Sequence, residues 1–426
     1  MNSGKHKIKI MPIEDLRVGM FIQDVGRSWF RHPWLTKSKL LTSTREIQAL
    51  ATYGIREVAV NLSLGVNPIE LDKEDRGKAG SPPRRPQPGK LEEVERRVSV
   101  RPEVAAETQV SWEEEISQVY EVRFRALQSV RISLESFRSG RPANLELARE
   151  SVTEIIDSVM RNRDAFLSLL KLRTHDHYDY NHPLNVAVLA VSFGRHIGLD
   201  RSQMSDLGLG CLLQDIGKTK VPPEILEKPG PLTGDEFELV KKHPVWGVKM
   251  LNECRGALPR PALSTALYHH ERFDGGGYPA GHAGSRLNPY VIIAGLADVF
   301  DAVSSDRPYN RGYQPFQALQ VLFRLRGEAF PAEWVDRFIQ CTGIYPTGTV
   351  VELNTGEMAV VTAVNHGQLL RPKITIISDA QGRPAKRWRN IDLNTETYKD
   401  RAVARVLDPR RAGVNPAVIV DPNFPG

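Results

Sequence analysis

Six side chains that could bind metal ions lie in five separate stretches of one part of the chain. They are His182, Asp215, His243, His269, His270 and Asp298, with His177 as a further histidine nearby. One histidine alone is more often structural than a ligand. The carboxylates in the same part of the chain are what favour a metal site. Asp298 lies within the apolar run Val291–Val303, where an unpaired charge would be costly to bury. A carboxylate in such a place usually has a cation beside it, and a metal ion is one such cation.

Imidazoles and carboxylates collected from several helices are typical of two-metal hydrolytic sites. Two divalent ions about 3.5–4 Å apart can share a hydroxide and hold the oxygens of a phosphoryl group under attack. The adjacent His269 and His270 would point about 100° apart on a continuing helix. Both can therefore reach one centre only if the helix ends there. Lys218 and Asp301 each follow one of the carboxylates by three residues, which places each beside that carboxylate on a helix.

Length and composition describe an ordinary globular protein. The chain has 426 residues, of which 41% are hydrophobic and 25% charged, which predicts two or three domains. Lys plus Arg (57) exceeds Asp plus Glu (51) by 57 − 51 = 6, a mild excess that many proteins share. The three cysteines are far apart and form no CxxC pair. This excludes a thiolate zinc site and a disulfide framework and favours reduced thiols.

No targeting or membrane segment is indicated. Residues 1–20 carry charges throughout and lack an apolar core, so we expect no signal peptide. The most apolar stretch, Leu184–Gly198, is interrupted by Arg195 and His196 and is too short to span a bilayer. We therefore expect a cytoplasmic protein without a membrane span.

The pattern along the chain predicts a mainly α protein in several parts. We expect a small α+β domain, a linker rich in Pro and charge, a helical domain with leading helices, a β-rich module and a loose tail. Their predicted bounds are residues 1–71, 72–109, 110–345, 346–407 and 408–426. The linker holds too few apolar residues to bury a core.

Single elements can also be predicted. Residues 43–53 are expected to be helical, with a capping box between Ser43 and Glu46, and residues 57–61 to be a strand. Helical spacing over 112–172 is broken near Gly140–Pro142, which indicates two helices. Beyond residue 347 the β-branched runs 349–353, 358–364 and 374–378 predict strands.

The motifs from His182 to Tyr309 resemble the HD-GYP family of cyclic di-GMP phosphodiesterases, a branch of the HD hydrolases. In order they read HPLNV from His182, QDIGK ending at Lys218, HPVWG from His243, HHERFDGGGYP from His269, ADVFDA ending at Ala302, and SDRPY ending at Tyr309. The series covers about three tenths of the chain, and the HHE…GYP element is highly specific. Residues 1–71 resemble the small domain that often precedes HD-GYP domains, through LRVGM and SWFRH. The resemblance implies an HD-type helical bundle.

The resemblance also implies residue roles. The six residues named above would be metal ligands, with Asp215 bridging two ions, and Fe or Mn would be the expected metals. Lys218 would contact the scissile phosphate and stabilise developing charge, while Asp301 and Arg307 would help to hold the nucleotide. Tyr178 stands where some members have a glutamate for a third ion, so we expect two ions at most. The implied reaction is hydrolysis of cyclic di-GMP to linear pGpG, to GMP, or to both.

One position departs from the family pattern. Family members have histidine directly before the bridging aspartate, and this chain has Gln214. An amide oxygen is a poorer ligand for a transition metal than an imidazole nitrogen. One ion could then bind weakly, take a water instead, or be absent. Two hypotheses follow: an active phosphodiesterase, or a degenerate domain that binds cyclic di-GMP or a partner protein and signals without turnover. An HD hydrolase for another nucleotide is disfavoured by the GYP loop.

The sequence also gives expectations about binding partners. The loop Gly275–Pro279 would shape the pocket and could meet GGDEF-type or other signalling proteins. Helices within 112–172 could form a homodimer through an apolar stripe or pack on their own domain. The basic run Lys386–Arg389 is typical of a solvated surface, so we expect no nucleic acid partner.

Overall fold

The computed structural model divides into two compact units, each described here by itself: Met1–Glu92 with Pro223–Phe237, and Glu93–Pro222 with Glu238–Gly426. Within them the structure describes residues 8–17, 20–24, 39–41, 44, 47, 56–61, 110–169, 178–228, 230, 232–254, 256–305 and 312–420.

The first unit contains a small antiparallel sheet. Its strands are β1 (Ile8–Pro12), β2 (Phe21–Asp24), β3 (Lys39–Leu40) and β4 (Glu57–Asn61), in the order β1-β4-β2-β3. The strand predicted at 57–61 is confirmed as β4. The helix predicted at 43–53 and its capping box lie largely outside the described residues.

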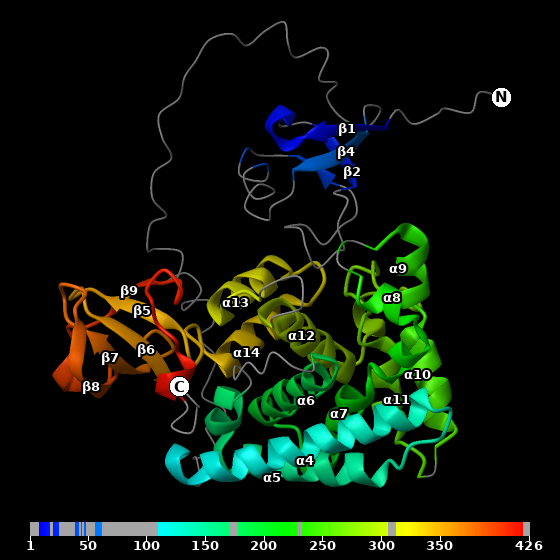
Figure 1. Ribbon diagram of the computed structural model, residues 1–426, viewed down its shortest axis with the longest axis horizontal. Helices are drawn as coiled ribbons and strands as arrows, with labels where there is room; N and C mark the ends of the chain where they lie inside the picture. Colours follow the sequence, from blue (N-terminus) through cyan, green and yellow to red (C-terminus); the bar gives the residue numbers. More distant parts are fainter. Residues whose placement is uncertain are drawn as a thin grey trace, which may run out of the picture. The chain divides into compact units, whose positions relative to one another are not determined.

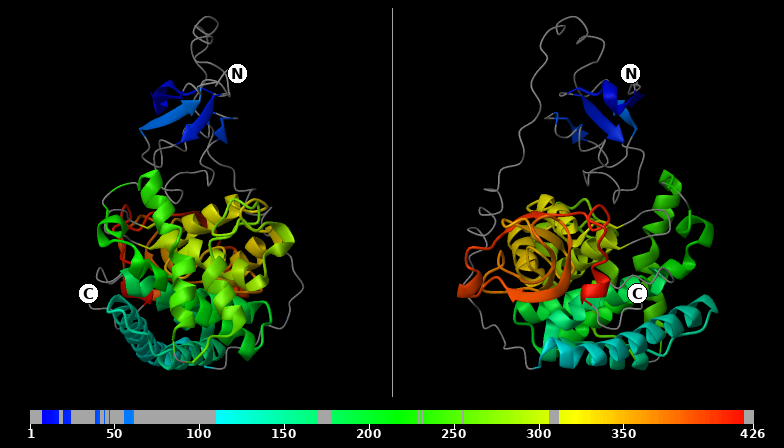
Figure 2. Two further views of the ribbon diagram at one scale, coloured as in Figure 1. Left: turned by 90° about the vertical axis from the view of Figure 1, so that its right-hand side faces the viewer. Right: turned by 60° about the vertical axis from the view of Figure 1, so that its left-hand side comes forward.

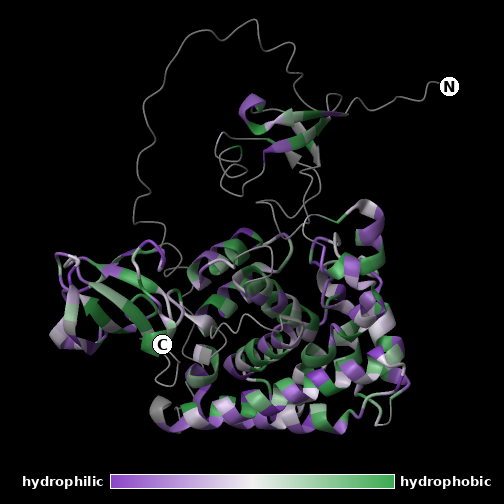
Figure 3. Cartoon of the chain, viewed as in Figure 1, coloured by the Kyte–Doolittle hydropathy of each residue, from purple (hydrophilic) through white to green (hydrophobic). Residues whose placement is uncertain are grey.

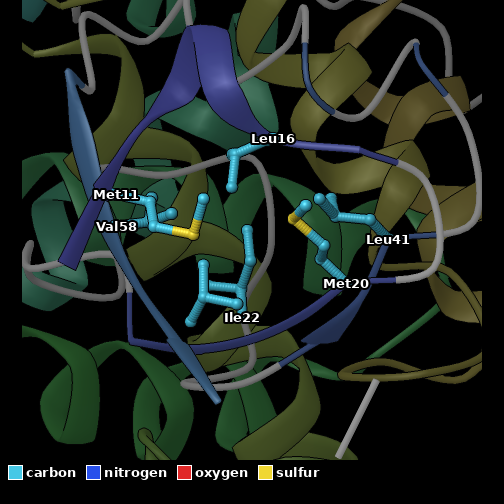
Figure 4. Close-up of a cluster of buried hydrophobic side chains, with 7 residues drawn as sticks. Met11, Leu16, Met20, Ile22, Leu41 and Val58 are labelled. Carbon is cyan, nitrogen blue, oxygen red and sulfur yellow. The ribbon is translucent and has the colours of Figure 1, made fainter. Parts of the chain in front are cut away.

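The core of this sheet comes from one of its faces. Val58 and Val60 are buried, while Glu57, the first residue of β4, is exposed, as strand alternation requires. They pack with the other buried apolar residues drawn in Figure 4, which are Met11, Leu16, Met20, Ile22 and Leu41. The unit also takes in the short helix α8 (Pro223–Leu226) and the first residues of α9 (Gly234–Val240).

The second unit begins with two long helices, α4 (Trp112–Arg138) and α5 (Glu146–Leu169), which confirms the predicted break. Ser111 and Glu114 form a capping box that starts α4. In α5 the backbone of Asn162 is not helical (φ −153°, ψ 100°). Its side-chain oxygen accepts a hydrogen bond from the N–H of Ala165 at 3.1 Å, so Asn162 starts the last turns of the helix anew.

Seven further helices build the bundle that holds the candidate site (Figure 1). They are α6 (Tyr178–His196), α7 (Arg201–Leu213), α10 (His243–Asn252), α11 (Arg260–Tyr268), α12 (Pro289–Ser304), α13 (Pro315–Arg324) and α14 (Ala332–Thr342).

Helices α6 and α12 form the centre of this bundle, where they pack on one another. Every residue from 182 to 194 in α6 and from 291 to 301 in α12 is buried, and both helices are largely green in the hydropathy colouring of Figure 3. A helix that is apolar on all sides belongs in a core. The few polar residues on these two helices must therefore find partners inside the protein.

The chain ends in a curved five-stranded antiparallel sheet (Figure 2). Its strands are β5 (Val350–Leu353), β6 (Met358–Ala363), β7 (Lys373–Ser378), β8 (Pro384–Asp392) and β9 (Val403–Val406), in the order β8-β7-β6-β5-β9. The three predicted strands are present as β5 to β7, and β8 and β9 were not foreseen. The mainly α class with a β-rich end is confirmed.

The segment expected to be a loose tail instead packs on this sheet as far as residue 420. It contains the short helix α15 (Ala417–Val420). Val420 is only 6% exposed and lies in a cluster with Val350, Val360 and Ile377. The prediction was wrong because the Pro and Arg content hid a few apolar residues that complete a small core. Among the described residues no helix is both long and apolar enough to cross a membrane.

Candidate metal centre

The candidate ligands come from five elements of the bundle. His182 lies in the second turn of α6 and Asp298 in the middle of α12. Asp215 follows α7, directly before the short helix η3 (Ile216–Lys220), and His243 begins α10. The pair His269-His270 follows α11, which ends at Tyr268. Because the helix stops there, both imidazoles can face one centre, and their ring centroids are 4.0 Å apart.

Four of these residues form a compact cluster, which we call the four-ligand half: Asp215, His243, His269 and His270. One potential ligand atom from each lies within 4.8 Å of those from the others, and all four residues are buried. Nε2 of His243 is 3.3 Å from Asp215 Oδ1 and 3.4 Å from Nε2 of His269. The cluster therefore brings three imidazoles and one carboxylate to a single point.

Hydrogen bonds on the far side of two rings set their tautomers. Nδ1 of His243 is 2.7 Å from the carbonyl oxygen of Val240, and Nδ1 of His269 is 2.9 Å from that of Ala266. A carbonyl can only accept, so Nδ1 of each ring carries the proton and Nε2 presents a lone pair to the centre. This is the arrangement in which histidine binds metal.

Two imidazoles in this half, those of His269 and His270, are held in the neutral form. Burial lowers the pKa of His269 to about 4, and the charge of His243 adds to the effect. Burial also places the pKa of His270 well below its ordinary value. Asp215 remains charged: burial opposes this, but the positive charge of Lys218 holds the pKa of its carboxyl well below the usual range.

A divalent cation fits this arrangement. Asp215 Oδ1 is buried and accepts no hydrogen bond from any described residue, and the nearest nitrogens, those of His243 and His269, present lone pairs. Buried polar atoms normally have partners, and an oxygen that faces two nitrogen lone pairs is repelled unless a cation lies between them. Three imidazoles and a carboxylate are a donor set suited to Zn, Fe or Mn.

The second group of residues, which we call the Gln214 half, is closed by hydrogen bonds. It consists of His182, Gln214, Asp298 and Asp301. His182 contacts both aspartates, with Nδ1 2.7 Å from Asp301 Oδ2 and Nε2 3.0 Å from Asp298 Oδ1. Its Nε2 is also 3.6 Å from Asp215 Oδ2, so Asp215 lies between the two halves.

Gln214 acts in this half as a donor. Its side chain is fully buried, and Nε2 donates to Asp298 Oδ1 at 3.2 Å. The amide oxygen is buried without a hydrogen-bond partner. An imidazole at this position would offer a lone pair to a metal ion, whereas the amide N–H occupies a lone pair of a candidate ligand. This half therefore has to break a hydrogen bond before Asp298 Oδ1 can bind a cation.

Lys218 and Asp301 serve the ligands in different ways. Nζ of Lys218 is 2.5 Å from Asp215 Oδ2, and its side chain is one third exposed, so it can also meet a ligand from outside. That Asp301 helps to hold the nucleotide stays a prediction, and the structure shows its contacts within the protein. It is 3% exposed, and Asn185 and Ser305 donate to its Oδ1 at 2.8 and 3.0 Å. With Oδ2 on His182, it orients that imidazole.

The loop Gly275–Pro279 is held beside His269 and His270 by hydrogen bonds and close packing. The carboxylate of Glu271 accepts backbone hydrogen bonds from Ala280, Gly281 and His282 at 2.7, 3.1 and 2.9 Å. A Cβ on Gly277 would lie 2.5 Å from the backbone of residues 270–272, so only glycine fits. The ring of Tyr278 packs on His270 with centroids 4.7 Å apart. The loop thus forms one wall beside the four-ligand half.

All predicted site residues in the described part of the chain meet at this centre. Arg307 and His177 lie outside the described residues. Sequence reasoning missed Asn185 and Ser305, which support Asp301. Asn185 follows His182 by one helical turn, and Ser305 belongs to the SDRPY motif, so spacing and motif both contained a signal.

The fold and this donor set define an HD-type metal phosphohydrolase. Three families match the chain: the HD domain over residues 155–332, a domain of unknown function (DUF3391) over 8–148, and a KOW domain associated with HD domain over 350–413. The match to the HD domain spans every candidate ligand.

Relatives extend the similarity to most of the chain. Cyclic di-GMP phosphodiesterase PA4108 of Pseudomonas aeruginosa is 33% identical over 402 residues, which are 93% of this chain and 91% of that protein. The response regulator RpfG of Xanthomonas campestris, a cyclic di-GMP phosphodiesterase, is 36% identical over 34% of this chain and 38% of its own. The 3'3'-cGAMP-specific phosphodiesterase 2 of Vibrio cholerae is 28% identical over 46% and 38%. The chain belongs to the HD-GYP family of HD-domain phosphodiesterases.

Proposed function

We propose that this protein is a metal-dependent phosphodiesterase that hydrolyses cyclic di-GMP to linear pGpG, GMP or both. The relative that matches 93% of the chain has this activity in its name. The observation that carries the proposal is the four-ligand half, where a buried carboxylate oxygen and two imidazole nitrogens face one another without a proton between them. Fe and Mn are the proposed metals, because both accept mixed nitrogen and oxygen ligands.

The residues would divide the work as follows. Asp215, His243, His269 and His270 would hold one ion, and Asp215, His182 and Asp298 a second. When bound, divalent ions lower the pKa of a water and draw charge from phosphoryl oxygens. Lys218 would place its ammonium group beside the phosphate and stabilise the charge that develops there. Asp301 would keep His182 oriented, and Arg307 would bind the nucleotide.

Metal analysis and turnover together test this function. Protein purified without air should contain Fe or Mn and should hydrolyse cyclic di-GMP when supplied with Mn²⁺ or Fe²⁺. Asp215→Ala should lose both bound metal and turnover, since this carboxylate lies between the halves. The same assay with 3'3'-cGAMP identifies the substrate, because one relative is specific for that dinucleotide. Absence of metal and of turnover on either dinucleotide would refute the proposal.

A second candidate function is a receptor without turnover, and Gln214 is the observation that favours it. Its hydrogen bond to Asp298 weakens one half of a centre that needs two ions for the full reaction. A receptor would bind cyclic di-GMP but leave it intact, and Arg307→Ala would abolish binding. An enzyme would release product, and single-turnover measurements separate the two.

Partner proteins are a further part of the proposal. Tyr278 faces His270, while Gly276, Pro279 and Ala280 on the same loop are exposed. The outer side of the loop is thus open to GGDEF-type or other signalling proteins. A pull-down that loses its partner in Pro279→Ser but not in Lys218→Ala would support this surface.

A further inference from the structure

A buried arginine from the leading helix α4 lies close to the Gln214 half. Arg123 is 8% exposed and stands near the middle of α4. Its guanidinium donates to Asn181 Oδ1 at 2.7 Å, and Asn181 directly precedes His182 in α6. A buried charge needs partners, so the location of Arg123 calls for an explanation from the residues around it.

The second partner of Arg123 is a carboxylate of the candidate centre. Burial lowers the pKa of Arg123, and the negative charge of Asp301 is the largest influence that opposes this. Asp301 in turn holds Nδ1 of His182 at 2.7 Å. Arg123 thus acts on two neighbours of His182: it donates a hydrogen bond to Asn181, and its charge interacts with that of Asp301.

The imidazole of His182 forms an ion pair with Asp301, with Nδ1 2.7 Å from Oδ2. Asn185 and Ser305, which contact its other oxygen, are neutral donors. The remaining carboxylates of the centre are served differently, since Asp215 has Lys218 at 2.5 Å. The positive charge of Arg123 also acts on the buried carboxylate of Asp301.

We propose that Arg123 is a positioning residue of the metal centre, which fixes Asn181 and Asp301 and through them the orientation of the His182 imidazole. The inference rests on the proposed function in that His182 is taken as a metal ligand. In this proposal Arg123 acts on the centre through Asn181 and Asp301.

Arg123 lies outside the part of the chain that matches the HD domain. It lies within the match to the domain of unknown function at 8–148 and before the HD domain match, which begins at residue 155. A helix outside the HD domain then supplies part of the support of the metal centre. An isolated HD domain cut at residue 155 would lack it.

The test uses the full chain and reads the His182 imidazole directly. In ¹⁵N-histidine-labelled, metal-free protein, the proton on Nδ1 of His182 should be protected by Asp301 and give a resolved signal, assigned by its loss in His182→Gln. We expect the signal to shift or vanish in Arg123→Met. Arg123→Lys keeps the charge without the planar fork and should show a smaller change in the same direction, so it serves if Arg123→Met folds poorly. Arg125→Met is the matched control, because Arg125 lies on the same helix, is half exposed and pairs with Glu154.

Activity gives a second readout. We expect kcat to fall about 10-fold in Arg123→Met, the low end of the range for partners of metal ligands, with KM nearly unchanged and Arg125→Met at wild-type level. A His182 signal identical to wild type in both Arg123 variants would overturn the inference. So would an equal loss of the signals of His243 and His269, which would mean general loosening of the fold. Because the signal is read without metal, it decides the matter even if the wild type has no turnover.

Discussion

The two halves of the candidate centre lie side by side and share Asp215, yet they use their lone pairs in opposite ways. In the four-ligand half, the protons of His243 and His269 point outward to backbone carbonyls, and Asp215 Oδ1 accepts no hydrogen bond. In the Gln214 half, His182 and Gln214 both contact Asp298 Oδ1. A cation can enter the first half without disturbing hydrogen bonds. In the second it must displace one.

The comparison teaches that residue type alone does not decide how ready a metal site is. Both halves contain imidazoles and carboxylates, and both are buried. What differs is whether the carboxylate oxygen of each half is already hydrogen-bonded: Asp215 Oδ1 accepts no hydrogen bond, whereas Asp298 Oδ1 is contacted by His182 and Gln214. An unsatisfied buried atom has its cost removed when metal binds. We therefore expect one ion to bind tightly in the four-ligand half and a second to bind more weakly in the Gln214 half.

The largest expected effect compares one histidine from each half. His243→Ala should remove the tightly bound ion and lower kcat about 10³-fold, since a metal ion supplies several kcal/mol to this chemistry. His182→Ala should leave that ion in place and lower kcat about 10- to 100-fold. Metal content after gel filtration and kcat for cyclic di-GMP are the measurements. Equal metal loss in both variants would abolish the distinction between the halves.

The second prediction concerns pH. His269 has a pKa of about 4 in the folded protein because of burial, against about 6.5 in an unfolded chain. The native state therefore binds fewer protons between these values, so stability is complete above about pH 6.5 and falls as the pH drops toward 4. The shift corresponds to about 3 kcal/mol for metal-free protein.

Urea unfolding of chelator-treated protein at several pH values, followed by helical circular dichroism, checks this. His196, whose pKa is also lowered to about 4 by burial, adds a slope of the same sign. His270, whose pKa is well below the ordinary value, adds to it too. The comparison with His269→Gln isolates one residue, since that variant should lose only the share of the slope between pH 6.5 and 4 that belongs to His269. If the free energy of unfolding varies with pH in His269→Gln as it does in the wild type, burial of His269 does not contribute to the pH dependence of stability.

The third prediction tests the wall of the four-ligand half. Gly277→Ala places a methyl group 2.5 Å from the backbone of residues 270–272, which should lower the free energy of unfolding by about 2 kcal/mol and weaken binding of the first ion by moving His270. Gly234→Ala is the control, because a Cβ there meets nothing within 4 Å, and it should change stability by less than about 0.5 kcal/mol. Equal stability of the two variants in chemical denaturation would contradict the assigned close packing.

The candidate ligands that meet at the centre could be picked out from the sequence because each stands in a local pattern. His269-His270 needed only a helix end, and Asp298 only an apolar run that would not tolerate a lone charge. The supporting residues could not be predicted in this way. Asn185 meets Asp301 across 116 residues of chain, and Arg123 meets Asn181 across 58. Such pairs depend on how α4, α6 and α12 pack, and no short-range pattern contains that information.

The hydrogen bonds of Asp301 could not be predicted for the same reason. Its spacing of three from Asp298 correctly placed it near the centre, but spacing cannot show which way a buried carboxylate is satisfied. In the β-rich module, the β-branched runs of β5 to β7 were visible in the sequence. Strand β8, with Lys, Arg, Trp and Asn, is exposed at the sheet edge over most of its length, so it lacks the alternation that marks a half-buried strand.

The smallest expected effect bears most directly on Gln214. Gln214→His removes the amide donor to Asp298 and adds an imidazole, so the second ion should bind about tenfold more tightly, while the first should be unaffected. Gln214→Met is the matched control: it has a similar shape and removes the donor without adding a ligand, so it should improve binding of the second ion less. Calorimetric titration with Mn²⁺ measures the affinities of the first and the second ion separately. If the histidine and methionine variants bind the second ion alike, the hydrogen bond to Asp298, and not the missing imidazole, limits this half of the centre. If neither differs from wild type, the Gln214 half is not weakened by its glutamine, and the asymmetry between the halves has another cause.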